Sequence, residues 1–176
     1  MVRSARILFL FICVVIIATG NVSAQEYVMP YPGFMPGHPL YKISETADTV
    51  QQWWSFGSFA RFKHHLALAD KKLIEAKTLL EYKQYFLATK AVTNYEYQLR
   101  LANKFLGEAQ NEGKDISEKK VVFRNAITKH REILERLKYE SPKEVFWNPE
   151  REVPQTIEIE KILNKAIELG KECEEK

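Results

Sequence analysis

The sequence predicts an all-α fold: an antiparallel helical bundle of three long helices, with a short helix before them and a C-terminal helix after them. From Pro39 onward, apolar residues return at alternating steps of three and four, which is the spacing of amphipathic helices. Glycine and proline interrupt this spacing at few places. No useful length alternates with the period of two that half-buried strands show, so strands are not expected.

Residues 1–24 have the pattern of a secretory signal peptide. Arg3 and Arg6 precede the uncharged apolar run 7–18, and small residues follow up to Ala24. The run has 12 residues, whereas a membrane-spanning helix needs roughly 20. We expect cleavage near Ala24 and a secreted or extracytoplasmic product. An uncleaved leader is the alternative, and it would be the only attachment to a membrane.

The chain after the leader has nearly balanced charge and one cysteine. Without Arg3 and Arg6, 24 basic residues stand against 23 acidic ones, a net charge of about +1. This balance gives no long-range attraction to nucleic acid. Cys13 lies in the leader, so Cys173 has no partner for an internal disulfide. We expect Cys173 to be a free thiol, or to join two copies by an intermolecular disulfide.

Residues 25–38 form a lead-in rich in proline and aromatic residues, and a helical domain is expected over 39–140. Pro39 suits the first position of the short helix. Gly57 and Ser58 are expected to close this helix and cap the next one. The helix should cover an apolar edge of the bundle with a stripe made of Leu40, Ile43, Ala47, Val50 and Trp54.

Three long helices of about 23 to 25 residues, or roughly 35 Å, are expected next. The first has an apolar stripe from Phe59 to Leu80 with strict heptad spacing, so a long partner helix must cover it. The following stripe is out of phase, which favours a hairpin near residues 81–86 over one kinked helix. Gly113 ends the second long helix, and the third carries His130 on its stripe.

Residues 141–155 form a proline-rich connector, because its three prolines cannot lie inside a helix. The stretch Val145–Trp147 is expected to press onto the bundle. A C-terminal helix is expected within residues 156–176, with Ile159, Leu163 and Ile167 on its apolar face.

Three segments resemble a bacterial family of domains of unknown function: "PGHPLYKISE" (36–45), "FKHHLALADKKLIEAKTLLE" (62–81) and "AVTNYEYQLRLA" (91–102). The family's hairpin core, Ala-x-x-(Lys/Arg)-Leu-x-Glu-Ala, would here run from Ala69 to Ala76. The resemblance covers about residues 30–137. It implies small exported proteins or outer domains of membrane proteins, some attached to anti-sigma-factor-like regulators, and no catalytic residues. The turn between the hairpin helices lacks the usual glycine, and His38 stands where small polar residues are common.

The helices offer little for a metal or haem. Two histidines share a metal from one helix only at a spacing of three or four, whereas His64 and His65 are adjacent and expected on a polar face. His130 is flanked by apolar residues and is expected at a core edge. No methionine follows Met35, so haem lacks a second ligand and we expect no cofactor.

The lead-in leaves two alternatives open. One is a soft-metal site for Cu(I), formed by Met29, Met35 and His38. The other, which the sequence favours, is that the lead-in folds back over the end of the first hairpin, with its prolines reducing the entropy lost. The docking residues would be Tyr31, Phe34, Met35 and Tyr41.

The stretch Trp53–Phe62 carries five large aromatic residues in ten positions. Trp54, Phe59 and Phe62 lie on apolar stripes and are expected in the core. Trp53 and Phe56 lie off these stripes, and an exposed patch there would mark a partner or membrane-interface site. The alternative is that the rings cap the end of the bundle.

Signatures of enzymes are missing, including G-x-S-x-G, H-E-x-x-H and a phosphate-binding glycine loop. No basic stripe is free of acids, so nucleic-acid binding is not expected. We expect a non-enzymatic exported protein that acts by protein–protein interaction in the cell envelope. The alternative is an extracytoplasmic protein that binds a small ligand or copper through its N-terminal segment. The partner-binding residues would be Trp53, Phe56, Phe34 and Tyr41.

Overall fold

The computed structural model describes residues 27–31, 33–36, 38–149 and 153–175. The all-α prediction is confirmed, because these residues form five helices and only one pair of short strands. The elements are α2 (Tyr41–Trp54), α3 (Ser58–Glu81), α4 (Tyr85–Asn111), α5 (Ser117–Glu140), β1 (Val145–Trp147), β2 (Gln155–Ile157) and α6 (Ile159–Glu175). The expected leader lies outside the described residues. Within the described part of the chain, no helix is both long enough and apolar enough to cross a membrane.

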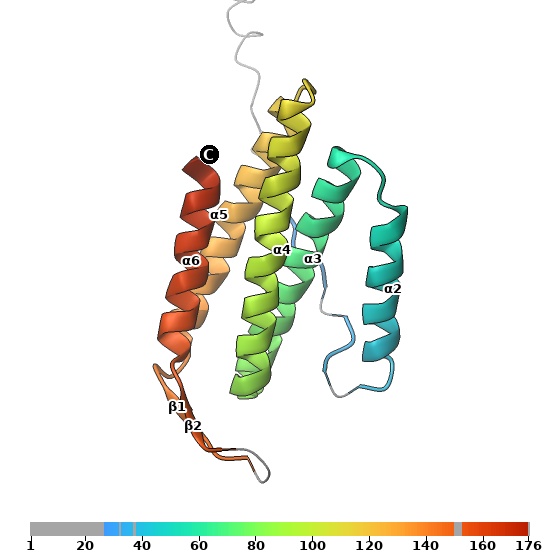
Figure 1. The fold of residues 1–176 in the computed structure, drawn as a ribbon. Coiled ribbons are helices and arrows are strands. Elements are labelled where there is room, and N and C mark those ends of the chain that lie inside the picture. Colours follow the sequence, from blue (N-terminus) through green and yellow to red (C-terminus); the bar gives the residue numbers. More distant parts are fainter. Residues whose placement is uncertain (1–26, 32, 37, 150–152, 176) are drawn as a thin grey trace, which may run out of the picture.

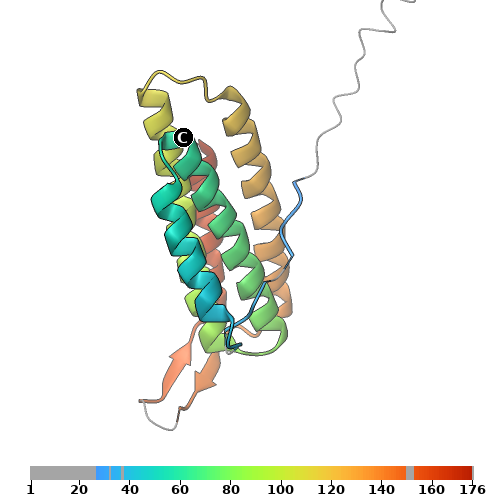
Figure 2. The same ribbon diagram turned by 90° about the vertical axis from the view of Figure 1, so that its right-hand side faces the viewer.

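Helices α3, α4, α5 and α6 lie side by side and alternate in direction, and α2 lies on the outer side of α3 (Figure 1). The N-terminal segment also runs along this group of helices, in the sense opposite to α2 (Figure 2). The four long helices supply almost all of the apolar core, with fully buried side chains such as Leu73, Tyr95, Leu134 and Leu163. The hydrophobic stabilisation therefore resides in α3–α6.

The turns of the two hairpins follow the sequence signals. α3 ends at Glu81 and α4 begins at Tyr85, so the phase break corresponds to a tight turn. Lys83 has a φ angle of 58° there, in the left-handed region that glycine usually occupies. Lys83 thus adopts a conformation that glycine reaches more easily than other residues. Gly113, with a φ angle of 75°, lies in the turn between α4 and α5 as expected.

The connector after α5 contains two strands, so the expectation of no strands is wrong. β1 and β2 pair antiparallel, with Val145 opposite Ile157. Each strand has only three residues, too few for a period-two pattern to be visible in the sequence. Trp147 stacks on Phe86 with ring centroids 4.1 Å apart, and this contact joins the connector to the helices as predicted. Phe146 is exposed.

The largest departure from the sequence prediction is the orientation of α2. Its apolar stripe was expected to cover an edge of the bundle, but Ile43, Val50 and Trp54 face solvent. Trp54 was expected in the core and is 77 % exposed, while Phe59 is only half-buried and Phe62 is buried as expected. The reason is that α2 packs on α3 through its opposite, polar face.

Candidate functional site

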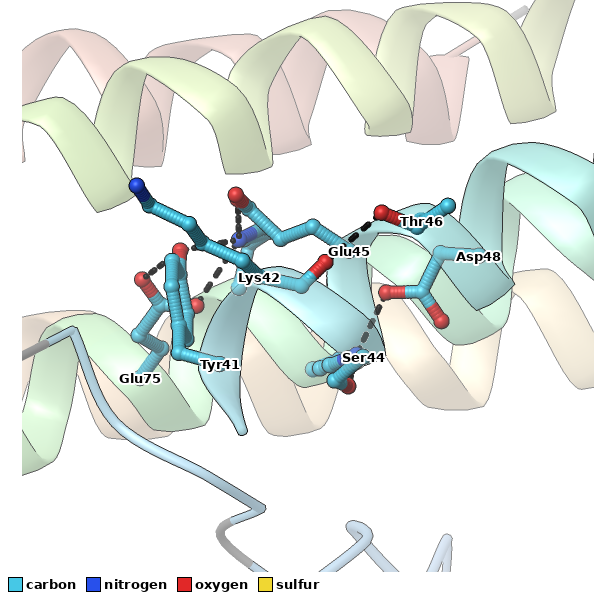
Figure 3. A network of polar contacts seen from close by, with 9 residues as sticks. Tyr41, Lys42, Ser44, Glu45, Thr46, Asp48 and Glu75 are labelled. Atoms are coloured by element: carbon cyan, nitrogen blue, oxygen red, sulfur yellow. Dashed lines mark hydrogen bonds and ion pairs between the residues drawn. The ribbon is translucent and has the colours of Figure 1, made fainter. Parts of the chain in front are cut away.

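The polar face of α2 is fixed to α3 by a network around Lys72. The Lys72 ammonium donates to the Tyr41 hydroxyl at 3.0 Å and to Glu75 Oε2 at 2.9 Å, and the Tyr41 hydroxyl donates to Glu75 Oε1 at 2.9 Å. Glu45 Oε1 lies 3.4 Å from the same ammonium. Figure 3 shows Tyr41 and Glu45 of α2 gathered here beside Glu75 of α3. Three charges and a hydroxyl therefore share one half-buried contact.

This network changes the acidity of its members. Burial would lower the pKa of Lys72, but hydrogen bonds to Tyr41 and Glu75 and the charge of Glu75 outweigh it and raise the Lys72 pKa above its usual value. Burial raises the pKa of Tyr41 to about 12, with Glu45 and Glu75 adding to the effect and Lys72 opposing it. At neutral pH the lysine is charged and the tyrosine is neutral, which is the state that this hydrogen-bond pattern requires.

A second polar contact lies one turn further along α2. The Lys71 ammonium donates to the Ser44 hydroxyl at 2.8 Å and forms an ion pair with Asp48. Residues 41, 44, 45 and 48 lie on one side of a helix, because steps of three and four return to the same face. The contacts with Lys71 and Lys72 consequently hold α2 in one rotational orientation.

This orientation turns the apolar side of α2 away from α3. Ile43, Ala47, Val50 and Trp54 line one side of α2, where a shallow hollow is bordered by Lys42, Thr46 and Gln51. Just beyond the line, Trp53 and Phe56 are each 79 % exposed. We call the surface formed by Ile43, Ala47, Val50, Trp53, Trp54 and Phe56 the α2 face.

The four residues predicted to bind a partner fall into three places. Trp53 and Phe56 lie together on the α2 face and border a hollow of about 400 Å³ with Arg61, His65 and Phe105. Phe34 lies on the N-terminal segment, where its ring stacks on His38 with centroids 4.9 Å apart. Tyr41 belongs to the contact between α2 and α3. The structure therefore groups Trp53 with Phe56 and adds Trp54, which sequence reasoning had assigned to the core.

The adjacent histidines are buried, in contrast to the expected polar face. His65 Nδ1 lies 2.7 Å from Gln98 Oε1, and its ring stacks on Phe105. His64 is 7 % exposed, and its Nε2 atom has no hydrogen-bond partner. Burial, together with the neighbouring His65, lowers the pKa of His64 and favours the neutral ring. The sequence pattern assigned these two histidines to a polar face. They are buried because α4 and α2 both cover this side of α3.

A cavity of about 920 Å³ lies between the N-terminal segment, α2 and α3. Its lining includes Met29, Phe34, Trp54, His64 and Lys71. The lining also holds the ammonium group of Lys63 and the carboxylates of Asp48 and Asp70, so several charged groups and one imidazole lie among its apolar side chains. A concave wall that combines apolar side chains with polar groups able to orient a ligand is the general form of small-molecule sites.

The N-terminal segment is anchored in the core by Tyr27, a residue that sequence reasoning did not select. The Tyr27 hydroxyl donates to Asp70 Oδ2 at 2.6 Å, and Asp70 Oδ1 lies 2.7 Å from His130 Nε2. His130 Nδ1 is 3.3 Å from the Tyr95 hydroxyl. His130 is 1 % exposed, so it lies in the core rather than at its edge as expected. A histidine on an apolar stripe signals a buried polar partner, but nothing in the pattern identifies Asp70 or Tyr27 as that partner.

The same buried cluster has no open position for a substrate at its histidine. Burial and the neighbouring Asp70 raise the pKa of Tyr27, and burial is also the largest cause of the raised pKa of Tyr95. Both tyrosines stay neutral at physiological pH. Each ring nitrogen of His130 already faces a protein group. The arrangement therefore fastens the N-terminal segment across α3 and α5.

The remaining lead-in residues only partly follow the predicted docking. Met29 and Met35 pack against the core, whereas Tyr31 is exposed. His38 Nδ1 accepts a hydrogen bond from the Leu40 amide at 3.1 Å. Met29 lines the large cavity, and neither Met35 nor His38 is part of that lining. Among the described residues, no group of three or more histidine, cysteine or carboxylate side chains is placed to hold a metal.

Cys173 lies on the buried side of α6 and is 6 % exposed. The Cys173 thiol is therefore covered by the neighbouring helices. An intermolecular disulfide would require this part of α6 to open first. That disulfide stays a prediction.

The fold and this surface together define an all-helical domain in which a short helix is docked through polar contacts and leaves its apolar side outward. The chain belongs to the DUF5667 family, a domain of unknown function whose match covers residues 33–144. No curated protein and no solved structure matches the chain significantly. The match includes α2, α3, α4 and α5 and ends before β1.

Proposed function

We propose that this protein is a non-enzymatic, exported bundle of antiparallel helices that acts by protein–protein interaction in the cell envelope, with the α2 face as its contact surface. The supporting observation for the surface is the exposure of Trp53 and Trp54 at the C-terminal end of α2 and of Phe56 just after it. Tryptophan is the side chain most enriched among residues that dominate binding energy at interfaces. The support for export is the leader-like pattern of residues 1–24.

Leaving an apolar face of this kind exposed to water is unfavourable in free energy. Soluble monomers rarely expose contiguous apolar patches larger than a few hundred Å², and the largest ones are often functional. Three large aromatic side chains, at roughly 150–250 Å² each and nearly four-fifths exposed, present about 350–600 Å². The α2 face therefore reaches the size at which a binding role becomes the simplest account.

The contact surface is tested by photo-crosslinking in intact cells, with a crosslinking amino acid at exposed Thr46. We expect the adducts to disappear in the double variant Trp53→Ala/Phe56→Ala, because the aromatic anchors are removed while the fold is not. The matched control is Tyr82→Ala/Tyr139→Ala, which removes two exposed aromatic residues elsewhere. If the Trp53→Ala/Phe56→Ala protein kept every adduct, the α2 face would not be the contact surface.

Export has its own measurement. Fractionation followed by mass spectrometry of the intact protein should find a chain that begins at Gln25 outside the cytoplasm. A full-length chain in the cytoplasm would contradict export.

The second candidate function is binding of a small extracytoplasmic ligand. It is favoured by the 920 Å³ cavity and by the buried, unpartnered His64 Nε2 beside it. Native mass spectrometry of the protein, purified without chelator, should then show an added mass that denaturation removes. If only the mass of the polypeptide is found, the N-terminal segment has a packing role over α3 and no ligand. If the added mass is that of a metal and is lost in Met29→Ala, the copper alternative is supported.

A further inference from the structure

The α2 face can be assigned a specific occupant, and this assignment rests on the proposed interaction function. Ile43, Ala47, Val50 and Trp54 form one straight line along α2, and Lys71 and Lys72 of α3 fix the opposite side. The helix is not free to roll its apolar line inward. The residues that the structure describes leave Ile43, Val50 and Trp54 more than half exposed, so none of them covers this line.

The extent of the face matches one side of a dimer interface. The three exposed aromatic side chains contribute about 350–600 Å². Ile43 and Val50, both more than half exposed, enlarge it toward the roughly 800 Å² per partner of a standard interface.

The charges bordering the line favour one direction of pairing between two copies. Lys42, at the start of α2, is the one charged residue among those that border the hollow. Two α2 helices packed in parallel would place the two lysines side by side, where they repel. Packed antiparallel, each Lys42 lies at the C-terminal end of the other α2, where the free carbonyl groups attract a cation. This surface carries no set of charges that would pair with those of a strongly acidic or strongly basic partner.

The sizes of the side chains are also self-complementary in the antiparallel direction. If the two-fold axis passes midway between Ala47 and Val50, Trp54 of one copy lies opposite Ile43 of the other, and Ala47 lies opposite Val50. Each large side chain then meets a smaller one. The short Ala47 side chain allows the helix axes to approach to the 8–10 Å that packed helices adopt.

We infer that the α2 face is covered by the α2 face of a second copy, in an antiparallel two-fold dimer. The same patch is used on both subunits, as closed two-fold assemblies require. In each subunit, Trp53 and Phe56 lie together near the C-terminal end of α2, next to Arg61 and Phe105 of the same subunit. The two-fold axis therefore places one such pair at each end of the contact.

Sedimentation equilibrium of the purified exported protein tests the dimer. We expect a dimer at micromolar concentrations and at least a tenfold higher dissociation constant for Val50→Glu, which places two carboxylates in the middle of the contact. Val121→Glu is the matched control, because Val121 on α5 is 55 % exposed and Val50 is 53 % exposed. Circular dichroism and thermal unfolding check that both variants fold.

The register is tested by disulfide formation under mild oxidation. A mixture of Ala47→Cys and Val50→Cys chains should give several times more crosslinked dimer than either variant alone, and wild type, with Cys173 buried, should give little. Efficient crosslinking of each variant with itself would overturn the antiparallel register.

The remaining outcomes separate this inference from the proposed function. A monomer at all concentrations, or a dimer that Val50→Glu leaves unchanged, overturns the inference. If such a monomer still crosslinks to a different envelope protein through Thr46, the interaction function stands with another occupant. If the monomer instead binds phosphatidylcholine vesicles, the occupant is the membrane surface and both statements fail.

Discussion

α2, with 14 residues, and α6, with 17, are the two shortest of the described helices, and both are amphipathic, but their apolar sides face opposite environments. α6 buries its apolar side, including Ile159, Leu163 and Ile167, against α4 and α5. α2 directs its apolar side outward and holds α3 through hydroxyl and charged groups. In both helices the apolar stripe correctly predicted which residues share one face. Only in α6 did it also predict that this face is buried against neighbouring helices.

The two attachments differ in strength for a physical reason. Burying one Leu or Ile side chain contributes about 1.5–3 kcal/mol, so the four buried Leu and Ile side chains of α6 make it part of the core. A hydrogen bond contributes about 1 kcal/mol net, and partly exposed ion pairs contribute less. α2 is consequently the less stably attached helix.

The largest expected effect comes from shortening one apolar residue in each helix. Leu163→Ala should lower the free energy of unfolding by about 2–5 kcal/mol, because Leu163 is 1 % exposed and its removal leaves a cavity. Val50→Ala should change it by less than about 0.5 kcal/mol in the monomer. Urea denaturation followed by circular dichroism measures both. Equal losses would mean that the apolar side of α2 is buried within its own chain.

The second effect concerns the polar attachment of α2. Lys72→Met should cost about 2–3 kcal/mol, because it leaves the buried Glu75 carboxylate without its cation. Hydrogen exchange should accelerate in α2 and stay unchanged in α6. The matched control is Lys77→Met on the same helix, whose ion pair with Glu81 is more exposed and should cost at most about 0.5 kcal/mol.

A double variant separates loss of the attachment from the penalty of a buried charge. Lys72→Met/Glu75→Leu removes the unpaired carboxylate and should restore most of the unfolding free energy. Its α2 should still exchange rapidly, because neither side chain can hold Tyr41. Slow exchange in this double variant would show that α2 is held without Lys72, by the Lys71 contacts or by apolar ones.

The difference between the two helices also marks how far the sequence could predict this fold. Periodicity located α3–α6 because one apolar side on each helix had to be buried, and Gly113 fixed a turn. The orientation of α2 depends on hydrogen bonds across 23 to 34 positions, and such pairs leave no periodic signal. Tyr27 and Asp70, 43 positions apart, were missed for the same reason. Of the candidate surface, Trp53 and Phe56 could be predicted, because they lie off every apolar stripe.

The smallest expected effect is a pH dependence confined to α2. Tyr41→Phe removes one hydroxyl and should cost about 1 kcal/mol at neutral pH. The Tyr41 pKa rises from its usual value of 10.0 to about 12 in the folded protein. The stabilisation is therefore fully present below about pH 10, where Tyr41 is protonated in both states. It declines as the pH rises toward 12, because the unfolded tyrosine ionises first and favours unfolding. The difference in unfolding free energy between wild type and Tyr41→Phe should shrink from pH 9 to pH 11.5, whereas the difference for Leu163→Ala should stay constant, because no titrating group is lost. A constant difference for Tyr41→Phe as well would show that its hydroxyl is not held between Lys72 and Glu75, and that another contact orients α2.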